Sequence, residues 1–213
     1  MKLYGSSLSP FVRKVLVFAA EKGIELELRP VAPGQPDPEF LAISPFGKIP
    51  GFRDGDFTIS DSTAIVSYLE AKHREPALIP AEPEARARAI WFEEFVDTIL
   101  VPAGAKVFFN RIVAQLIGRE PDLAAADKAA AEEMPPLYRY LEGVLCEQEW
   151  LVGERLTIAD VSVGSVFVNM LHAGEPVDAA TYPKLAAYVA RWFERPSLKT
   201  WLERERAFLS GNV

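Results

Sequence analysis

The stretch YGSSLSPFVRKV, residues 4–15, sets three serines between an apolar strand segment and the start of an apolar helix. Ser9 is a residue type that caps helices, and Pro10 suits the first helical position because its missing N–H would be unpaired there. The pattern predicts a short strand before the serines and a helix from Ser9 to Gly23. A hydroxyl at that helix start lies beside unpaired backbone N–H groups, where an anion is favoured.

Outward from this stretch, the first third of the chain alternates between strand and helix signals. Residues 24–31 alternate apolar and charged side chains, as a half-buried strand does, and a loop with one short helix near Phe40 follows. The pair Asp54-Gly55 lies between two apolar runs and predicts a hairpin. Cap residues then open an amphipathic helix over 60–73. The predicted order is β-α-β-α-β-β-α.

The remainder of the chain predicts helices only. A proline-rich segment of low periodicity marks a linker, which we place at 77–84 between domains 1–76 and 85–213. The long apolar region after the linker should kink or split at Pro102 and Gly104. Further helices are predicted within 122–148, within 156–174 and on both sides of Pro196. Thr157 and Asp160 have the spacing of a capping box, which is a structural role.

Composition excludes several classes of function. The chain has 213 residues and a net charge of −7, which argues against nucleic acid as a partner. No apolar run approaches the ~20 residues of a membrane span, and the start lacks the apolar core of a signal peptide, so we expect a cytoplasmic protein. The single cysteine, Cys146, excludes an internal disulfide, and His73 and His172 show no metal-ligand spacing.

The interaction energy that a hydroxyl and a helix N-terminus offer is large enough to lower the pKa of a thiol bound at the start of the first helix. A thiol with a pKa of ~8.5 is only slightly ionised at neutral pH, and lowering that pKa by roughly 2 units requires about 2.7 kcal/mol. One hydrogen bond to a charged group supplies ~1.5–3 kcal/mol, and a helix N-terminus adds ~0.3–1 kcal/mol. The stretch alone leaves open whether Ser9 activates a thiol or only caps the helix.

Four motifs, in their order along the chain, favour the interpretation that Ser9 activates a thiol. The succession of LYG…SPFVRKV, GKIPGF, SDSTAIVSYLE, a proline-rich linker and LTIADVSV resembles the cytosolic glutathione S-transferases over nearly the whole chain. The run SPFVRKV looks most like the tau-type and related bacterial members, whose active serine directly precedes the proline. The resemblance implies an α+β/α fold, in which a thioredoxin-like N-terminal domain (βαβαββα) precedes an all-helical C-terminal domain.

The resemblance also implies a glutathione site, with glutathione as co-substrate and no metal. Ser9 matches the residue that donates a hydrogen bond to the sulfur. Ile49 precedes a proline that the family keeps cis, and its backbone would pair with the tripeptide like an added strand. The residues that match glutathione-binding positions are Lys48, for the glycyl carboxylate; Ile49 and Pro50; Asp61, for the ammonium group; and Ser62, for the γ-glutamyl carboxylate. The family more often has Glu or Gln at the position of Asp61.

Other residues compete for these roles. Ser6 or Ser7 would be the activator if the register were different. Some classes of the family use a tyrosine on the first strand as the activator, although Tyr4 fits a packed strand residue better. Classes that form mixed disulfides have a cysteine where Ser9 stands, which disfavours a thiol reductase, and Cys146 reads as an inert buried thiol. The candidates for a hydrophobic electrophile pocket are Leu8, Phe11, Phe108, Phe109 and Ile112.

The sequence therefore predicts a serine-type glutathione transferase, of the kind that serves in detoxification, which conjugates glutathione to a hydrophobic electrophile. The alternatives are glutathione-dependent isomerisation or dehalogenation at the same site, and a non-catalytic ligand-binding or interaction protein of the same fold. A homodimer is expected from the resemblance, with helices near 61–71 and 85–100 as the candidate faces.

Overall fold

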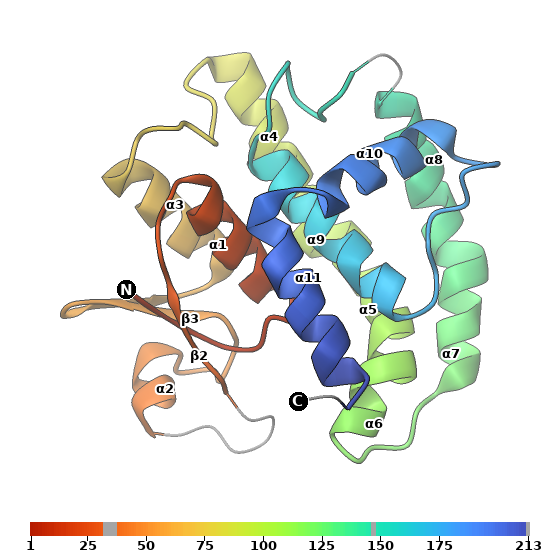
Figure 1. Ribbon diagram of the computed structural model, residues 1–213, viewed down its shortest axis with the longest axis horizontal. Coiled ribbons are helices and arrows are strands. Elements are labelled where there is room, and N and C mark those ends of the chain that lie inside the picture. The colour runs from red at the N-terminus through yellow and green to blue at the C-terminus, as the bar shows by residue number, and fades with distance from the viewer. Residues whose placement is uncertain (32–37, 146–147, 212–213) are drawn as a thin grey trace. The chain divides into compact units, whose positions relative to one another are not determined.

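The computed structural model describes residues 1–31, 38–145 and 148–211 of the chain (Figure 1). The residues fall into two compact units, Met1–Leu78 and Ile79–Val213. Cys146, predicted to be an inert thiol, lies outside the described residues. The domain bounds predicted from the sequence remain a proposal.

The first unit is a four-stranded mixed sheet with three helices, in the predicted order. The strand order is β2-β1-β3-β4, with β1 parallel to β2 and antiparallel to β3, and with β3 antiparallel to β4. This is the thioredoxin-like arrangement, and the βαβαββα prediction is confirmed. The elements are β1 (Lys2–Tyr4), α1 (Pro10–Glu21), β2 (Glu27–Arg29), α2 (Pro38–Ile43), β3 (Gly51–Asp54), β4 (Phe57–Ser60) and α3 (Ser62–Lys72).

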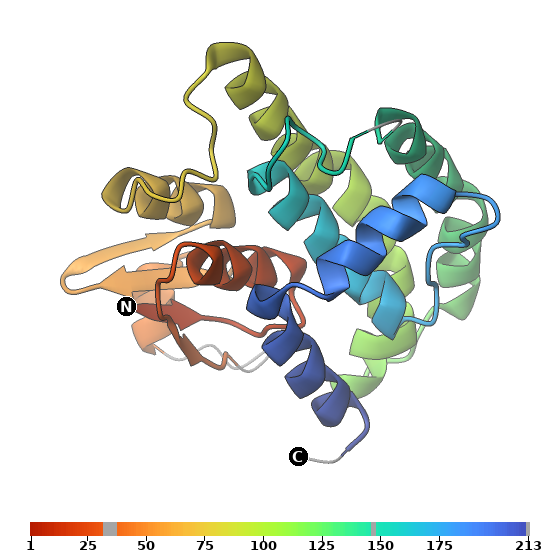
Figure 2. The ribbon, with the colours of Figure 1, turned by 45° about the horizontal axis from the view of Figure 1, so that its top comes forward.

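The two faces of this sheet are covered by different helices (Figure 2). Leu3 and Phe52 are paired across β1 and β3, and neither is exposed to solvent, because α1 and α3 cover their face. Tyr4 follows Leu3 and points the opposite way, where it joins Phe40 and Ile43 of α2 in a small apolar cluster. The centre of the sheet, at β1 and the start of β3, is therefore covered on both faces, whereas the edge strands β2 and β4 are partly exposed.

The second unit is all-helical, as predicted. Its centre is the helix α9, which is apolar and buried over nearly its whole length, and α4, α5 and α10 pack around it. The elements are α4 (Pro83–Phe95), η1 (Val96–Leu100), α5 (Val101–Phe108), η2 (Phe109–Val113), α6 (Ala114–Leu116), α7 (Leu123–Lys128), η3 (Ala129–Glu133), α8 (Met134–Val144), α9 (Ile158–His172), α10 (Pro183–Phe193) and α11 (Pro196–Leu209).

The long helical region splits at the predicted place by changing its winding. The segment η1 is a π-helical turn that directly precedes Val101 and Pro102. A proline cannot donate the regular bond of an α-helix and its ring crowds the preceding turn, and the wider π-turn accommodates both effects. The stretch Pro83–Leu116 has an 18-residue window of mean hydropathy 1.3, which length and composition alone would allow to cross a membrane. Of that window, 33% is buried inside the structure.

The predicted capping box starts α9. The Thr157 N–H donates to Asp160 Oδ2 at 2.8 Å, and the carboxylate also accepts from the Leu151 N–H and the Tyr188 hydroxyl. Asp160 is fully buried, and burial raises its pKa to about 6, although the four donors around it act in the opposite direction. Thr157 and Asp160 therefore serve the fold of the second unit.

Candidate active site

Three loop segments meet at one end of the sheet in the first unit. Tyr4, at the carboxyl end of β1, is opposite Gly51, at the amino end of β3, and Gly51 is opposite Ser60, at the carboxyl end of β4. The segments that adjoin these three residues therefore emerge side by side: the serine loop 5–9, the segment 48–50, and the start of α3 at 61–62. The Asp61 N–H donates to the Pro50 carbonyl at 3.3 Å and ties the last two segments together.

Gly5 brings the serine loop against the segment 48–50. A Cβ added at Gly5 would lie 2.6 Å from Val12 Cγ2 and 3.3 Å from Ile49 Cβ, so only a glycine fits between these side chains. Gly5 also has a φ of +154°. Because of this close approach, the loop that carries the serines begins beside the Ile49 backbone.

Ser9 is the N-cap of α1. Its Oγ accepts a hydrogen bond from the Val12 N–H at a long distance of 3.5 Å, its carbonyl accepts from the Arg13 N–H, and Pro10 occupies the first helical position. The cap uses a lone pair of the oxygen, and among the described residues the Ser9 hydroxyl hydrogen has no acceptor. Capping therefore leaves the hydroxyl able to donate to an anion at the helix start.

The competing hydroxyls have different surroundings. Ser6 Oγ accepts from the Leu8 N–H at 3.4 Å, and the Ser6 carbonyl accepts from the Ser9 N–H, so Ser6 closes the turn before the helix. Tyr4 is 4% exposed, and its hydroxyl donates to Glu39 Oε1 at 2.7 Å. Burial, and then this carboxylate, raise the pKa of Tyr4. Tyr4 is thus engaged on the face of the sheet that α2 covers.

The segment before β3 presents backbone rather than side chains. The Ile49-Pro50 peptide bond is cis, as the resemblance implies. Within the part of the chain that the structure describes, neither the N–H nor the C=O of Ile49 has a hydrogen-bond partner. Lys48 is exposed, and its ammonium group has no ion-pair partner among those residues. The segment offers a free backbone donor, a free acceptor and a cation.

The start of α3 offers a second polar group. Ser62 is 3% exposed, and its hydroxyl makes no hydrogen bond within the described segments. Asp61 caps the helix by accepting from the Ala64 N–H at 3.0 Å. Asp61 is also the one described non-glycine residue with a positive φ, at 82°, a conformation that costs a typical residue about 1–3 kcal/mol and is found most often at functional sites.

Family models account for most of the chain. The model for the glutathione S-transferase N-terminal domain matches residues 3–77, and that for the glutathione S-transferase C-terminal domain matches residues 108–205. The chain belongs to the glutathione S-transferase family.

Individual relatives agree with this assignment. The chain is 32% identical to glutathione S-transferase 3 of Zea mays, over 95% of the chain and 87% of the relative. It superposes on glutathione transferase F7 of Populus trichocarpa with a TM-score of 0.83 and 28% identity, covering 95% of this chain and 97% of that one. A glutathione S-transferase of Rhodospirillum rubrum gives a TM-score of 0.85 at 28% identity, covering 92% and 89%.

The protein is thus an enzyme with glutathione transferase activity, and glutathione is its co-substrate. The finer resemblance to tau-type and related bacterial members stays a prediction. The structure brings Ser9, Lys48, Ile49, Pro50, Asp61 and Ser62 to one end of the sheet.

The residues predicted for the electrophile pocket belong to different units. Leu8 and Phe11 flank Ser9 and Pro10 in the first unit, where both are partly buried. In the second unit Phe108 is 6% exposed at the end of α5, while Phe109 and Ile112 belong to the π-turn η2, with Phe109 36% exposed. These five residues remain candidates.

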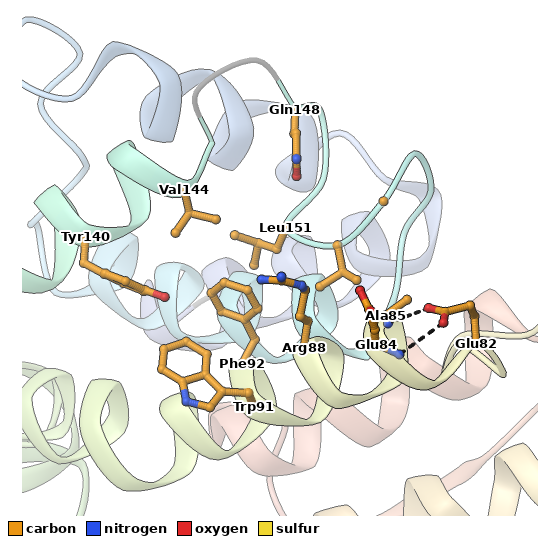
Figure 3. Close-up of a pocket in the computed structure, with 12 residues that line it drawn as sticks. Glu82, Glu84, Ala85, Arg88, Trp91, Phe92, Tyr140, Val144, Gln148 and Leu151 are labelled. Carbon is orange, nitrogen blue, oxygen red and sulfur yellow. Dashed lines mark hydrogen bonds between the residues drawn. The ribbon is translucent and has the colours of Figure 1, made fainter.

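The helical unit of the transferase holds two further features. Arg111 Nη1 and Nη2 pair with Glu175 and Asp127 at 2.6 and 2.9 Å, so this arginine links η2 to α7 and to the segment after α9. A cavity of about 770 Å³ lies between α4, the end of α8 and the segment before α9, with the rings of Trp91, Phe92 and Tyr140 on one side (Figure 3). In the described ranges no group of three or more His, Cys, Asp or Glu residues could hold a metal ion.

Sequence reasoning missed two residues that shape the site. Glu39 receives the Tyr4 hydroxyl and an ion pair from Arg53, but a glutamate in the first turn of a short helix gives no signal of either partner. Ser44 bonds to the backbone of Lys48, and the run SPFG indicates only a turn. Both contacts depend on how the chain returns to the sheet.

Proposed function

We propose that this transferase conjugates the glutathione thiolate to a hydrophobic electrophile and that Ser9 stabilises the thiolate. One observation supports the proposal most directly: three groups without internal partners adjoin the same end of the sheet. They are the Ser9 hydroxyl hydrogen, the Ile49 backbone and the Ser62 hydroxyl. Polar groups that the protein itself leaves unpaired in one region are available to a polar ligand, because each can still donate or accept a hydrogen bond.

Glutathione fits these groups in an extended conformation. Its cysteinyl backbone would pair with the N–H and C=O of Ile49 as an added strand does. Its γ-glutamyl carboxylate would accept hydrogen bonds from the Ser62 hydroxyl and from the N–H groups at the start of α3, while Asp61 would receive the ammonium group. Lys48 would pair with the glycyl carboxylate. The thiol would then lie at the N-terminus of α1.

Ser9 acts by stabilising an anion, and it takes no proton. Its hydroxyl donates to the sulfur, the helix N-terminus adds its partial positive charge, and the thiol proton leaves to solvent. The thiolate then attacks the electrophilic carbon. A carbon–sulfur bond forms, and the leaving group departs with the electron pair of the bond that breaks. Leu8 and Phe11, which flank the cap, are proposed to contact the electrophile.

Calorimetry and turnover test this proposal separately. Wild-type protein is expected to bind glutathione with a micromolar-to-millimolar Kd, and Ser62→Ala to weaken binding roughly 10–100-fold, the value of one hydrogen bond to a charged group. Turnover of an activated aryl chloride distinguishes conjugation from simple binding. No detectable binding at millimolar glutathione would remove the proposal's basis, and binding without turnover of any aryl or alkyl halide would leave a different reaction at the site.

We also propose a cytoplasmic homodimer, with α3 and α4 as the faces that pair. The segment of α4 and η1 presents Trp91 and Ile99 with 48% and 47% of their surface exposed, and Trp91 stacks on Phe95 with ring centroids 5.5 Å apart. Large exposed apolar residues on one face are typical of surfaces that a partner covers.

Light scattering tests the homodimer at micromolar protein. Trp91→Glu is expected to shift the mass from dimer toward monomer, because a charge would be buried in the interface. Leu123→Glu is the matched control, since Leu123 is 51% exposed but belongs to α7 and to neither of the proposed faces. A monomeric wild-type mass, or equal effects of the two variants, would contradict the proposal.

A further inference from the structure

Ser44 stands at the end of α2 with every polar group in use. Its N–H donates to the Phe40 carbonyl at 2.8 Å, and its carbonyl accepts from the Gly47 N–H at 2.9 Å. Its hydroxyl donates to the Lys48 carbonyl at 2.7 Å and accepts from the Lys48 N–H at 3.1 Å. Ser44 is only 1% exposed, so water does not compete for these bonds. One buried side chain therefore holds both backbone groups of the residue that precedes Ile49.

The element that carries Ser44 is itself fixed to the sheet. A Cβ added at Gly51 would lie 3.1 Å from Ile43 and 3.3 Å from Phe40, so α2 rests directly on the backbone of β3. In the first turn of α2, Glu39 Oε1 accepts from the Tyr4 hydroxyl at 2.7 Å and pairs with Arg53 at 3.1 Å. Ser44 thus follows an element that is packed on the sheet, and its hydroxyl is the side-chain link from that element to the Lys48 backbone.

The loop it holds would otherwise have few constraints. Phe46 is 89% exposed, Gly47 has a left-handed φ of 62°, and Lys48 is exposed, so side-chain packing contributes little to the shape of residues 45–48. The two hydrogen bonds of the Ser44 hydroxyl are what orient the Lys48 peptide groups. The orientation of those groups sets the direction in which the next residue, Ile49, presents its free N–H and C=O.

We infer that Ser44 is a positioning residue for glutathione, which sets glutathione affinity by holding the Lys48 backbone so that the Ile49 backbone is ready to pair. The inference rests on the proposed pairing of glutathione with Ile49. Ser44 would reach the ligand only through Lys48, and among the described residues of the first unit no hydrogen bond links Ser44 to Ser9. Its loss should therefore act on glutathione binding and leave the thiol chemistry unchanged.

Ser44→Ala is compared with Phe40→Leu, which weakens the same α2 cluster and keeps the hydroxyl. Ser44→Ala is expected to raise the Kd and KM for glutathione about tenfold, with kcat at saturating glutathione and the pKa of the bound thiol unchanged. Phe40→Leu is expected to lower the melting temperature at least as much, with a Kd within about twofold of wild type. A Kd for Ser44→Ala within twofold of wild type, or an equal rise in Phe40→Leu, would overturn the inference.

Amide hydrogen exchange in the wild-type enzyme tests the same point without a variant. In the free enzyme the Lys48 N–H should be protected, because it donates to a buried oxygen, and the Ile49 N–H should exchange fast; glutathione should then protect Ile49. An unprotected Lys48 N–H would show that the Ser44 hydroxyl does not hold the Lys48 backbone in solution. If wild-type enzyme binds no glutathione, the proposed function fails. If the wild-type enzyme binds glutathione and Ser44→Ala binds it with the same Kd, only the proposed role of Ser44 is wrong.

Discussion

Replacing Ser9 with alanine separates the two roles that this residue combines. The cap bond from the Val12 N–H to Ser9 Oγ is long, at 3.5 Å, so its loss should cost at the low end of the range for caps, about 0.5–1 kcal/mol. The variant should therefore remain folded, with a small decrease in melting temperature. If the variant remains folded, a large loss of activity must come from the lost hydrogen bond to the sulfur and not from unfolding.

The expected loss of activity follows from the free hydroxyl hydrogen. A hydrogen bond to a charged sulfur is worth ~1.5–3 kcal/mol, whereas the helix N-terminus, which the variant keeps, supplies only ~0.3–1 kcal/mol. The pKa of the bound thiol should thus rise by roughly 1–2 units toward its free value of ~8.5. We expect kcat/KM to fall about 10²–10³-fold, the effect of removing one preorganised donor to an anion.

Two measurements check this expectation. Ultraviolet thiolate absorbance of bound glutathione, followed from pH 5 to 9, gives the thiol pKa, and initial rates with an activated aryl chloride give kcat/KM. Cys146→Ala serves as a control and should change neither quantity. If Ser9→Ala keeps normal turnover while Ser7→Ala or Tyr4→Phe abolishes it, the assignment is wrong and Ser9 only caps α1.

Two further predictions concern the framework. Gly5→Ala should destabilise the first unit by about 1–3 kcal/mol and weaken glutathione binding, because the new Cβ would lie 2.6 Å from Val12 and press toward Ile49. Denaturant unfolding measures the loss of stability, and calorimetry measures the loss of binding. A variant as stable as the wild type would show that the close approach at Gly5 is absent in solution. Asp160 has a pKa of about 6 when folded against ~3.9 unfolded, so the folded state holds the proton more tightly. Its contribution to stability is full below about pH 4 and declines by roughly 3 kcal/mol as pH rises through 6. Asp160→Asn should remove that decline from unfolding free energies measured between pH 4 and 7, and an unchanged slope would refute the assignment.

The sequence by itself determined the order of the elements, because the signals for them act within a few residues. Ser9 with Pro10 marks the start of α1, Asp54-Gly55 marks the hairpin, and Thr157 with Asp160 marks the start of α9. Caps, turn residues and apolar periodicity are local signals, so they can be recognised in the sequence without any knowledge of tertiary contacts. Bounds were less well defined: the strand expected over 24–31 is only Glu27–Arg29, since one parallel neighbour pairs with just that part.

Only the tertiary structure decided which polar groups are free to meet a ligand. Tyr4, Ser9 and Ser44 are all hydroxyls near one end of the sheet, and the sequence does not distinguish them by chemistry. The fold brings Glu39, 35 residues away, to the Tyr4 hydroxyl, and a turn brings Lys48 back to Ser44. The hydroxyl hydrogen of Ser9, in contrast, has no acceptor among the described residues. These pairings depend on strand register and on the packing of α2 against Gly51, which are set by contacts between segments distant in sequence.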